Sequence, residues 1–341
     1  GRIAGGSILG GRQSVFYWLN GFFIFHNIEA SILIMRIANG IILILLLCLA
    51  YKSASKSRSV ALWSVLTFTS IPTFVFYLNS NNSSSWTYLG TGLGWFFADA
   101  ALTSKIRSQR NFALFGFLVC ICLTLGSRSE GIAYLALQVA FVCLLHAEVV
   151  TKKLKKLWLI AIGCASLTFL TLVVVRSSSF GLLKSGFAYV FDDTPLQRHG
   201  FSVFIYNLQA VSDLYVGIVG ASDTELFGFI QLAMTSACAF IVLTALRGSS
   251  KRTKILYFIW TLICIALPLW LLQISNLIVG EELAPRYLYP LFVFGVALSF
   301  FHREQQPSFS RNQMMVISIA ISIAHSMVLR QVLIRHIYGI E

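Results

Sequence analysis

The chain alternates long apolar runs with short loops, and most of its 26 lysines and arginines gather in every second loop. Membrane proteins retain Lys and Arg on the cytoplasmic side of the bilayer, which produces this alternation. The basic loops are 52–58, 105–110, 152–156, 247–254 and 303–311. The pattern therefore predicts a chain that crosses a membrane repeatedly, with these loops on the inner side.

The composition agrees with a membrane location. Hydrophobic residues make up 57% of the chain and charged residues only 11%, whereas soluble domains carry about 25% charged residues. The net charge of +13 is divided among small clusters on one predicted face of the membrane. We therefore expect no nucleic-acid partner, because such a partner needs a continuous basic surface.

The apolar runs predict an all-α polytopic membrane protein. Each run is unbroken and lacks the alternation of a barrel strand, and about ten are long enough to cross bilayer hydrocarbon of roughly 30 Å. The predicted spans are 30–51, 60–78, 86–103, 111–126, 132–147, 157–175, 226–246, 255–277, 287–301 and 313–332. The fourth and the ninth are short, so we expect them to tilt or to be partly re-entrant.

The charge pattern divides the chain into three parts. Residues 1–29 are predicted on the outer side, 30–332 form one transmembrane domain, and 333–341 are an outer tail. An outer N-terminal segment needs a helix to carry it across, so we expect at least one upstream helix. The long outer loop 176–225 contains apolar residues at helical spacing between 201 and 215, which predicts an interfacial helix.

No soluble-enzyme motif is present in the sequence. All seven cysteines lie inside apolar runs, without the spacing of metal ligands, so we expect buried apolar side chains and no metal site. Gly90-Thr91-Gly92 lies within a predicted span. Its glycines are therefore expected to permit close helix packing rather than nucleotide binding.

Three outer-side clusters are candidates for ligand binding. In the turn from Ser127 to Gly131, Arg128 can reach a phosphate with its planar guanidinium, or can form a local ion pair with Glu130 in a solvated turn. Of the other two clusters, one combines two carboxylates with an arginine and the other consists of carboxylates alone. Either can instead be a solvated surface. They are Glu281, Glu282, Arg286 and Tyr287 before the ninth span, and Asp192, Asp193 and Asp223 in the long loop.

Two charged residues lie deeper in the predicted spans. Arg36 is expected to extend to the outer headgroups. Asp99 lies toward the inner end of its span and is expected to meet Lys105 and water at the surface. His146 is expected to be interfacial or packed, and neither charged residue resembles a proton relay.

A set of short motifs resembles those of the bacterial family of predicted membrane proteins called domain of unknown function 2142. The motifs are Arg36-Ile-Ala-Asn39-Gly40, Ile71-Pro72, the polar turn Asn79 to Ser84, Ser127-Arg128, Gly217 to Leu226, and Arg286-Tyr287-Leu-Tyr-Pro290-Leu291. The likeness runs from Arg36 to Phe301. Family members tend to have proline where this chain has Ser129 and Phe227.

The resemblance implies a function because that family is similar to the integral-membrane glycosyltransferases of the C superfamily. Those enzymes use polyprenyl-phosphate sugars and usually carry an acidic residue on the first outer loop, which would lie upstream of Gly1. The likeness implies a helical arrangement of that kind, with the interfacial helix as a lid. It implies donor-phosphate binding by Arg128, Arg198 and Arg286, supported by Glu130, Asp223 and Tyr287. Asp192, Asp193, Glu281 and Glu282 are the visible candidates for a catalytic acid.

The expected activity is transfer of a sugar from a polyprenyl-phosphate donor onto a cell-envelope glycan or lipid, on the outer face of a bacterial plasma membrane. The implied partners are the lipid bilayer, the donor and the glycan acceptor, and a divalent cation is an additional candidate. Three alternatives stay open: a transporter or flippase of lipid-linked saccharides, a polymerase of such saccharides, and a noncatalytic scaffold. A transporter predicts internal repeats and helices broken at the midplane.

Overall fold

The computed structural model describes five main stretches of the chain. They are 15–69, 81–127, 129–149, 249–275 and 288–300, with short pieces at 218–219, 224–225, 236, 239–240, 242–247, 315, 319, 322–323, 326 and 330. The predicted spans 157–175, 226–246 and 313–332, the predicted interfacial helix and the tail 333–341 lie wholly or mainly outside these residues.

The described part is predominantly helical, which confirms the predicted fold class at this level. The helices are α1 (Val15–Gly21), α2 (Ile28–Ser53), α3 (Lys56–Thr69), α5 (Ser84–Thr103), α6 (Arg107–Ser127), α7 (Ser129–Leu145), α12 (Lys251–Ser275) and α13 (Tyr289–Phe300). A short antiparallel pair, β1 (Ile218–Val219) and β2 (Thr224–Glu225), lies in the predicted outer loop. The sequence did not predict this pair, which is too short to cross a membrane.

Helix α2 shows how local sequence sets the boundaries of an element. Asn27 precedes it, and the side-chain oxygen of Asn27 accepts a hydrogen bond from the Ala30 amide at 3.1 Å. Glu29 in the first turn and Lys52 in the last turn match the positive and negative ends of the helix dipole. Between them the helix is almost wholly apolar.

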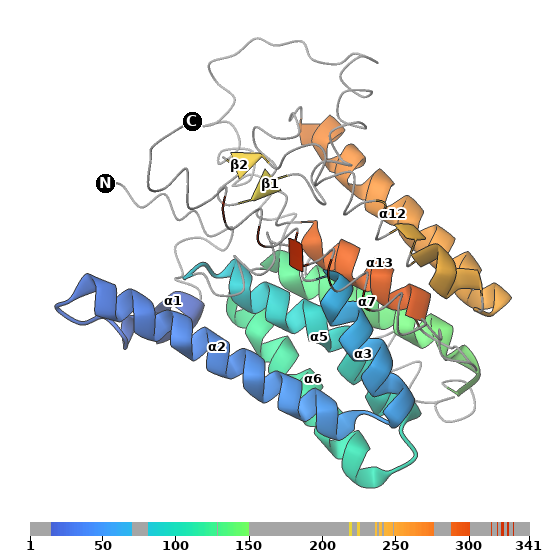
Figure 1. The fold of residues 1–341 in the computed structure, drawn as a ribbon, viewed down its shortest axis with the longest axis horizontal. Coiled ribbons are helices and arrows are strands. Elements are labelled where there is room, and N and C mark those ends of the chain that lie inside the picture. Colours follow the sequence, from blue (N-terminus) through green and yellow to red (C-terminus); the bar gives the residue numbers. More distant parts are fainter. Residues whose placement is uncertain are drawn as a thin grey trace, which may run out of the picture.

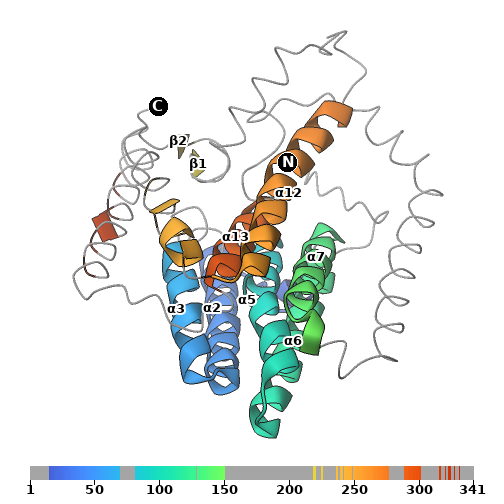
Figure 2. The same cartoon turned by 90° about the vertical axis from the view of Figure 1, so that its right-hand side faces the viewer.

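Helix α5 is the centre of the bundle, and its side chains from Ser84 to Ala100 are buried. It packs most extensively against α6 and also contacts α2, α7 and α13 (Figure 1). Figure 2 shows α2, α3, α5, α6 and α7 running side by side along one direction, with α12 inclined to them. The apolar core of the described part therefore forms around a single, fully surrounded helix.

Glycine permits the close contact between α5 and α6. A methyl group at Gly90 would lie 2.6 Å from the Thr124 Cγ2 atom and 2.7 Å from the Cys120 carbonyl oxygen. At Gly92 it would meet nothing within 4 Å. The expectation that these glycines permit close helix packing is therefore confirmed for Gly90, whereas the described residues leave open space around Gly92.

Two described helices, α2 and α6, are long and apolar enough to cross a membrane. A core helix of a soluble protein would be mostly buried, but only 11% of the most apolar window of α2 is buried. Exposed isoleucines and leucines along α2, such as Ile41 and Ile44, are stable against lipid and unfavourable against water. With 21 residues from Arg107 to Ser127, α6 is also longer than the sequence predicted, because the helix continues into the basic loop.

Helix α1 was not predicted. It lies in the segment assigned to the outer side, and its Phe16 side chain is buried against Trp86, with ring centroids 5.2 Å apart. A methyl group at Gly126 would lie 3.3 Å from the Val15 Cβ atom. The N-terminal segment thus packs where α5 begins and α6 ends.

Candidate functional site

The basic loops 52–58 and 105–110 meet at one end of the bundle, which we call the basic end. Arg58 donates hydrogen bonds to the hydroxyls of Thr103 and Ser104. Gln109 donates to the Ala54 carbonyl at 3.4 Å. The two loops, with the described helices α3 and α5 between them in sequence, therefore lie on the same side of the bundle, as the alternation of charge predicts.

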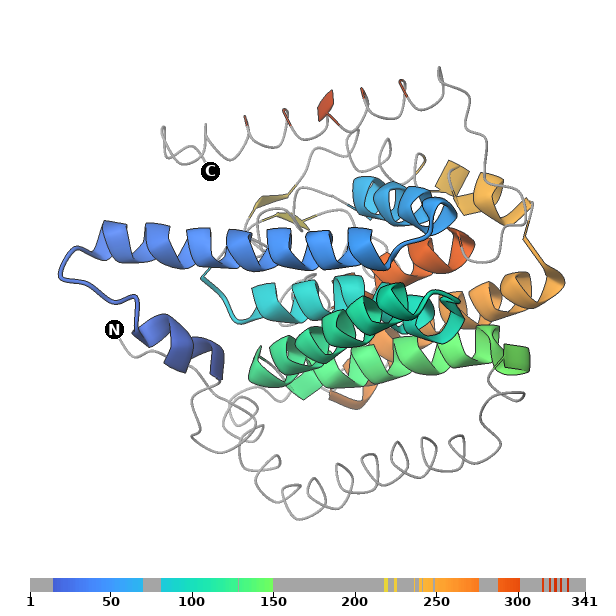
Figure 3. The ribbon, with the colours of Figure 1, turned by 90° about the horizontal axis from the view of Figure 1, so that it is seen from below.

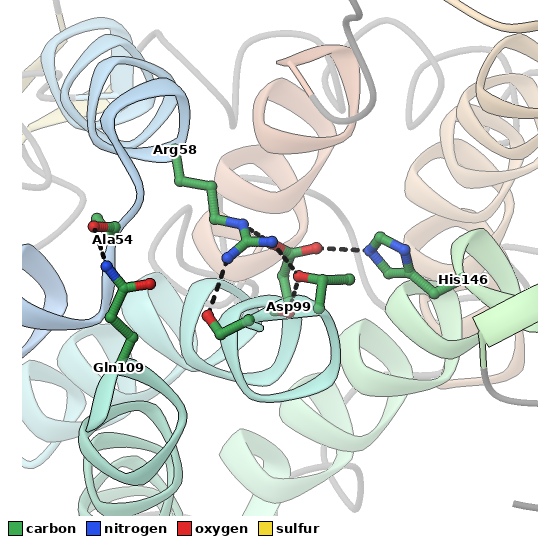
Figure 4. A network of polar contacts seen from close by, with 7 residues as sticks. Ala54, Arg58, Asp99, Gln109 and His146 are labelled. Carbon is green, nitrogen blue, oxygen red and sulfur yellow. Dashed lines mark hydrogen bonds and ion pairs between the residues drawn. The ribbon is translucent and has the colours of Figure 1, made fainter. Parts of the chain in front are cut away.

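Asp99 is the centre of a buried polar network at the basic end. Its Oδ2 atom lies 3.0 Å from the Arg58 Nε atom, and its Oδ1 atom lies 2.6 Å from the His146 Nε2 atom. Figure 4 shows Arg58 from α3 and His146, directly after α7, approaching the carboxylate from opposite sides. The side chains of Asp99 and His146 are 7% and 4% exposed, so the pair is shielded from water.

This geometry corrects the expectation that Asp99 would meet Lys105 at the surface. Lys105 is exposed, and the structure places Arg58 and His146 against the carboxylate. The expectation that His146 is packed is confirmed by its 5% exposure. Because both carboxylate oxygens have partners, the network connects α3, α5 and the end of α7 rather than offering an open ligand site.

The opposite end of the bundle contains polar groups without partners. We call it the serine end, defined by residues 81–87, 126–127 and 129–131. Among the described residues, four buried side-chain atoms have no hydrogen-bond partner: Asn81 Oδ1, Ser84 Oγ, Ser85 Oγ and Gln138 Oε1. Three of the four lie at the start of α5. Burying such a group unpaired costs about 1–3 kcal/mol, so a native structure needs a reason to keep three of them together.

The start of α5 is fixed by its own backbone. Asn82 accepts from the Ser84 amide through its side chain and from the Ser85 amide through its carbonyl, both at 2.9 Å. The side chains of Ser84 and Ser85 are left available, with residue exposures of 2% and 0%. The unpartnered hydroxyls are thus part of a well-defined helix start.

A hydrogen bond connects this helix start to the turn between α6 and α7. The hydroxyls of Thr87 and Ser127 are 2.6 Å apart, and both side chains are buried. Ser84 lies one helical turn before Thr87 and therefore on the same face of α5. The residue that follows Ser127 in the sequence is Arg128, the predicted phosphate ligand, which itself lies outside the described residues.

Trp86 supports the serine end from the side of α2. Its indole nitrogen donates to the Asn39 side-chain oxygen at 3.0 Å, and Asn39 is 3% exposed. Phe16 of α1 packs edge-on against the same indole. The first turn of α5 is therefore in contact with α1, α2 and α6.

Most of the predicted site residues lie outside the described part of the chain. They are Arg128, Asp192, Asp193, Arg198, Asp223, Glu281, Glu282, Arg286 and Tyr287. Glu130 belongs to α7 by its backbone, and Arg36 is exposed on α2, as snorkelling requires. Within the residues that the structure describes, no group of three or more His, Cys, Asp or Glu could hold a metal ion.

The sequence analysis did not identify Ser84 and Ser85 as site residues, although it singled out the polar turn from Asn79 to Ser84. The signal was a run of hydroxyl and amide side chains directly before an apolar span. Whether such side chains turn into the bundle depends on where the helix begins, and the sequence predicted a start two residues later, at Trp86.

An apolar helical bundle with exposed hydrophobic faces, in which the basic loops 52–58 and 105–110 meet at one end, is typical of an α-helical membrane protein. The model of the family of predicted membrane proteins called domain of unknown function 2142 matches residues 13–295. The chain belongs to this family, which confirms the resemblance seen in its motifs. The search of curated proteins and the search of solved structures found no match to the chain.

Proposed function

We propose that this protein is a multi-pass membrane glycosyltransferase. It would move a sugar from a polyprenyl-phosphate donor onto a cell-envelope glycan or lipid at the serine end of the bundle. The observation that carries the proposal is the cluster of unpartnered polar atoms on Asn81, Ser84 and Ser85. The cluster lies beside the hydrogen bond that fixes Ser127, the residue before Arg128.

The donors and acceptors of this cluster suit a sugar better than a bare phosphate. The free Asn81 oxygen only accepts hydrogen bonds, whereas the hydroxyls of Ser84 and Ser85 donate or accept. A phosphate group offers acceptors alone and would leave the Asn81 oxygen unpaired. Sugar hydroxyls both donate and accept, and burial strengthens each hydrogen bond that they make.

The phosphate of the donor needs cations, which the arginines supply. Arg128, Arg198 and Arg286 are assigned to bind it, since a guanidinium pairs with phosphate in a bidentate manner. Glu130, Asp223 and Tyr287 are assigned supporting roles. A divalent cation held by carboxylates of the outer loops would neutralise the same charge.

The transfer itself breaks the bond between the anomeric carbon and the phosphate oxygen, and the bond electrons leave with the lipid phosphate. An acceptor hydroxyl forms the new bond to that carbon and loses its proton to a general base. Asp192, Asp193, Glu281 and Glu282 are the candidates for this base within the chain. The serine end would face the outside of a bacterial plasma membrane, with the basic end in the cytoplasm.

Substitution of the assigned arginines tests the proposal. The protein is reconstituted in nanodiscs with a polyprenyl-phosphate donor carrying a radiolabelled sugar and with solubilised envelope glycan as acceptor. Arg286→Ala is expected to abolish label transfer while membrane insertion is retained. Arg107→Ala at the basic end is the matched control and should transfer at the wild-type rate. Unchanged transfer by the Arg286→Ala protein would remove Arg286 from the site.

A transporter or flippase of lipid-linked saccharides is the competing function, and one observation favours it. Asp99 and His146 form a buried ionisable pair inside a helical bundle, and such pairs mark ion pathways in many transporters. Transport predicts that Asp99→Asn stops movement of a fluorescent lipid-linked saccharide between leaflets of a liposome. Transfer of sugar with no such movement would support the transferase. A polymerase would need a second lipid-linked substrate as acceptor, and a scaffold would show neither activity.

A further inference from the structure

Helix α1 has one face buried against the bundle and one face exposed. Phe16 and Asn20, four residues apart, are 1% and 8% exposed, and the side-chain amide of Asn20 donates to the Phe16 carbonyl at 2.8 Å. On the other side, Tyr17 is 51% exposed and Trp18 59% exposed. The helix therefore presents large aromatic side chains away from the protein.

The exposed apolar surface continues from α1 into the connection to α2. Phe22, Ile24 and Phe25 are 64%, 70% and 51% exposed, and Ile28 at the start of α2 is 73% exposed. No lysine, arginine, aspartate or glutamate occurs from residue 13 to residue 28. A charge-free, aromatic surface of this kind is unfavourable in water and favourable at a membrane interface.

The position of α1 along the bundle matches the boundary of a bilayer. Val15 lies beside Gly126, and α6 begins at Arg107 in the basic loop. At a rise of 1.5 Å per residue these two positions on α6 are about 29 Å apart, close to the roughly 30 Å of membrane hydrocarbon. Helix α1 thus lies about one hydrocarbon thickness from the basic end.

Helix α2 is longer than the membrane hydrocarbon is thick. The connection between α1 and α2 therefore lies outside the hydrocarbon. The 26 residues of α2 extend about 39 Å. In Figure 3, as in Figure 1, the connection between α1 and α2 lies farther out than the first turn of α5. From α1, at the hydrocarbon boundary, the chain thus continues outward to the level of the headgroups, turns around there, and enters the membrane through α2.

We infer that α1 and residues 22–27 form a membrane-inserting element whose partner is the phospholipid leaflet at the serine end. The exposed surface is continuous in sequence with the start of α2, a candidate membrane span whose own exposed residues are mostly apolar. Tyr17 and Trp18 would lie among the headgroups, where amphipathic rings are most stable. Through Phe16 and Trp86 the element contacts the first turn of α5, so the leaflet would help to position the serine end.

Fluorescence of Trp18 tests this inference without any assay of activity. Wild-type protein and a Trp18→Phe variant are placed in nanodiscs of phosphatidylcholine with brominated acyl chains. The difference between the two emission spectra isolates Trp18, and phenylalanine preserves the apolar surface. We expect bromine to remove most of this difference emission, and aqueous iodide to leave most of it. As a control, Trp260→Phe reports a side chain that is 1% exposed and should be protected from both quenchers.

Two outcomes would overturn the inference. Quenching of the Trp18 emission by iodide and not by brominated lipid would place α1 in water. Protection from both quenchers would place α1 against protein, such as a second copy of the chain. Either result leaves the proposed transferase activity untouched, because the measurement requires no donor or acceptor.

Discussion

The two ends of the bundle differ in whether their buried polar groups have hydrogen-bond partners. At the basic end, each oxygen of the Asp99 carboxylate has a partner, Arg58 on one side and His146 on the other. At the serine end, the hydroxyls of Ser84 and Ser85 are equally buried and have none. The polar network of the basic end is satisfied within the folded protein, whereas the hydroxyls of the serine end are left available for the bound sugar that we propose.

The contrast follows from what burial costs. A buried charge needs partners in the folded protein itself, because an unpaired one is strongly destabilising. An unpaired hydroxyl costs less, about 1–3 kcal/mol, which a bound ligand or water can recover. We therefore expect the side chains of the basic end to contribute mainly to stability, and the hydroxyls of the serine end to contribute mainly to the proposed binding of sugar.

Removing the carboxylate of Asp99 is expected to have the largest effect. Asp99→Ala leaves the partly buried Arg58 guanidinium without its counter-charge and the buried His146 ring without the carboxylate, and breaking a buried pair in this way typically costs about 3–5 kcal/mol. Unfolding in detergent, followed by circular dichroism, should show a strongly lowered transition temperature. Lys105→Ala is the control, since Lys105 is exposed and its removal should change stability by about 0.5 kcal/mol or less. Equal losses in the two variants would show that the network has no structural role.

A smaller effect is expected at the contact between α5 and α6, which connects the two ends. Gly90→Ala would place a methyl group 2.7 Å from the Cys120 carbonyl oxygen, and relieving this overlap typically costs about 1–3 kcal/mol. Gly92→Ala, with nothing within 4 Å, should be neutral or slightly stabilising because alanine favours helix. The same unfolding assay compares the two. A greater loss in the Gly92 variant would contradict the packing described for α5.

The positions of the long apolar helices were predictable because a membrane permits few alternatives, whereas the short helix α1 was not predicted. Backbone groups in lipid must bond within their own segment, so a long apolar run becomes a helix. The predicted spans 30–51 and 86–103 correspond to α2 and α5 within two residues at each end. The start of α6 was placed four residues late, because the polar side chains of the basic loop continue the helix without interrupting it.

The partners of Asp99 were not predictable from the sequence. Arg58 lies on α3 and His146 directly follows α7. Their approach depends on how α7 packs against α5 and on how α3 packs against α13, which also contacts α5. Lys105 was the nearest basic residue in sequence after the carboxylate, which made it the natural expectation. Proximity in sequence fails here because Lys105 follows the end of α5 and points to the exterior, whereas Arg58 extends across from α3.

The candidate site was predictable only in outline. The sequence placed a polar turn at the start of α5 and Arg128 after Ser127, and the hydrogen bond between Thr87 and Ser127 connects these two regions. That bond requires a particular rotation of α5 against α6, which periodicity alone does not fix. The burial of Ser84 and Ser85 follows from the same rotation.

Breaking that bond should have a modest effect on stability. Thr87→Val preserves the shape of the side chain and removes the hydroxyl that lies 2.6 Å from the Ser127 hydroxyl. The expected loss is about 1 kcal/mol, the usual contribution of one buried hydrogen bond. The comparison is Thr261→Val, which removes a hydroxyl bonded only to the Tyr257 carbonyl of its own helix. Equal stability of the Thr87 variant and wild type would mean that α5 and the α6–α7 turn are not joined by this contact.

The smallest effect on stability is expected for Ser85→Ala. This variant distinguishes the two ends most clearly, because it should lower activity without lowering stability. The serine hydroxyl has no partner in the unliganded protein, so its loss removes no bond, and alanine is the better helix former. The unfolding temperature should stay the same or rise slightly. Transfer of labelled sugar should nevertheless fall, since a hydrogen bond to a bound sugar contributes about 0.5–1.5 kcal/mol, or roughly two- to tenfold. A variant that lost stability but transferred sugar normally would make the serine end structural, as the basic end is.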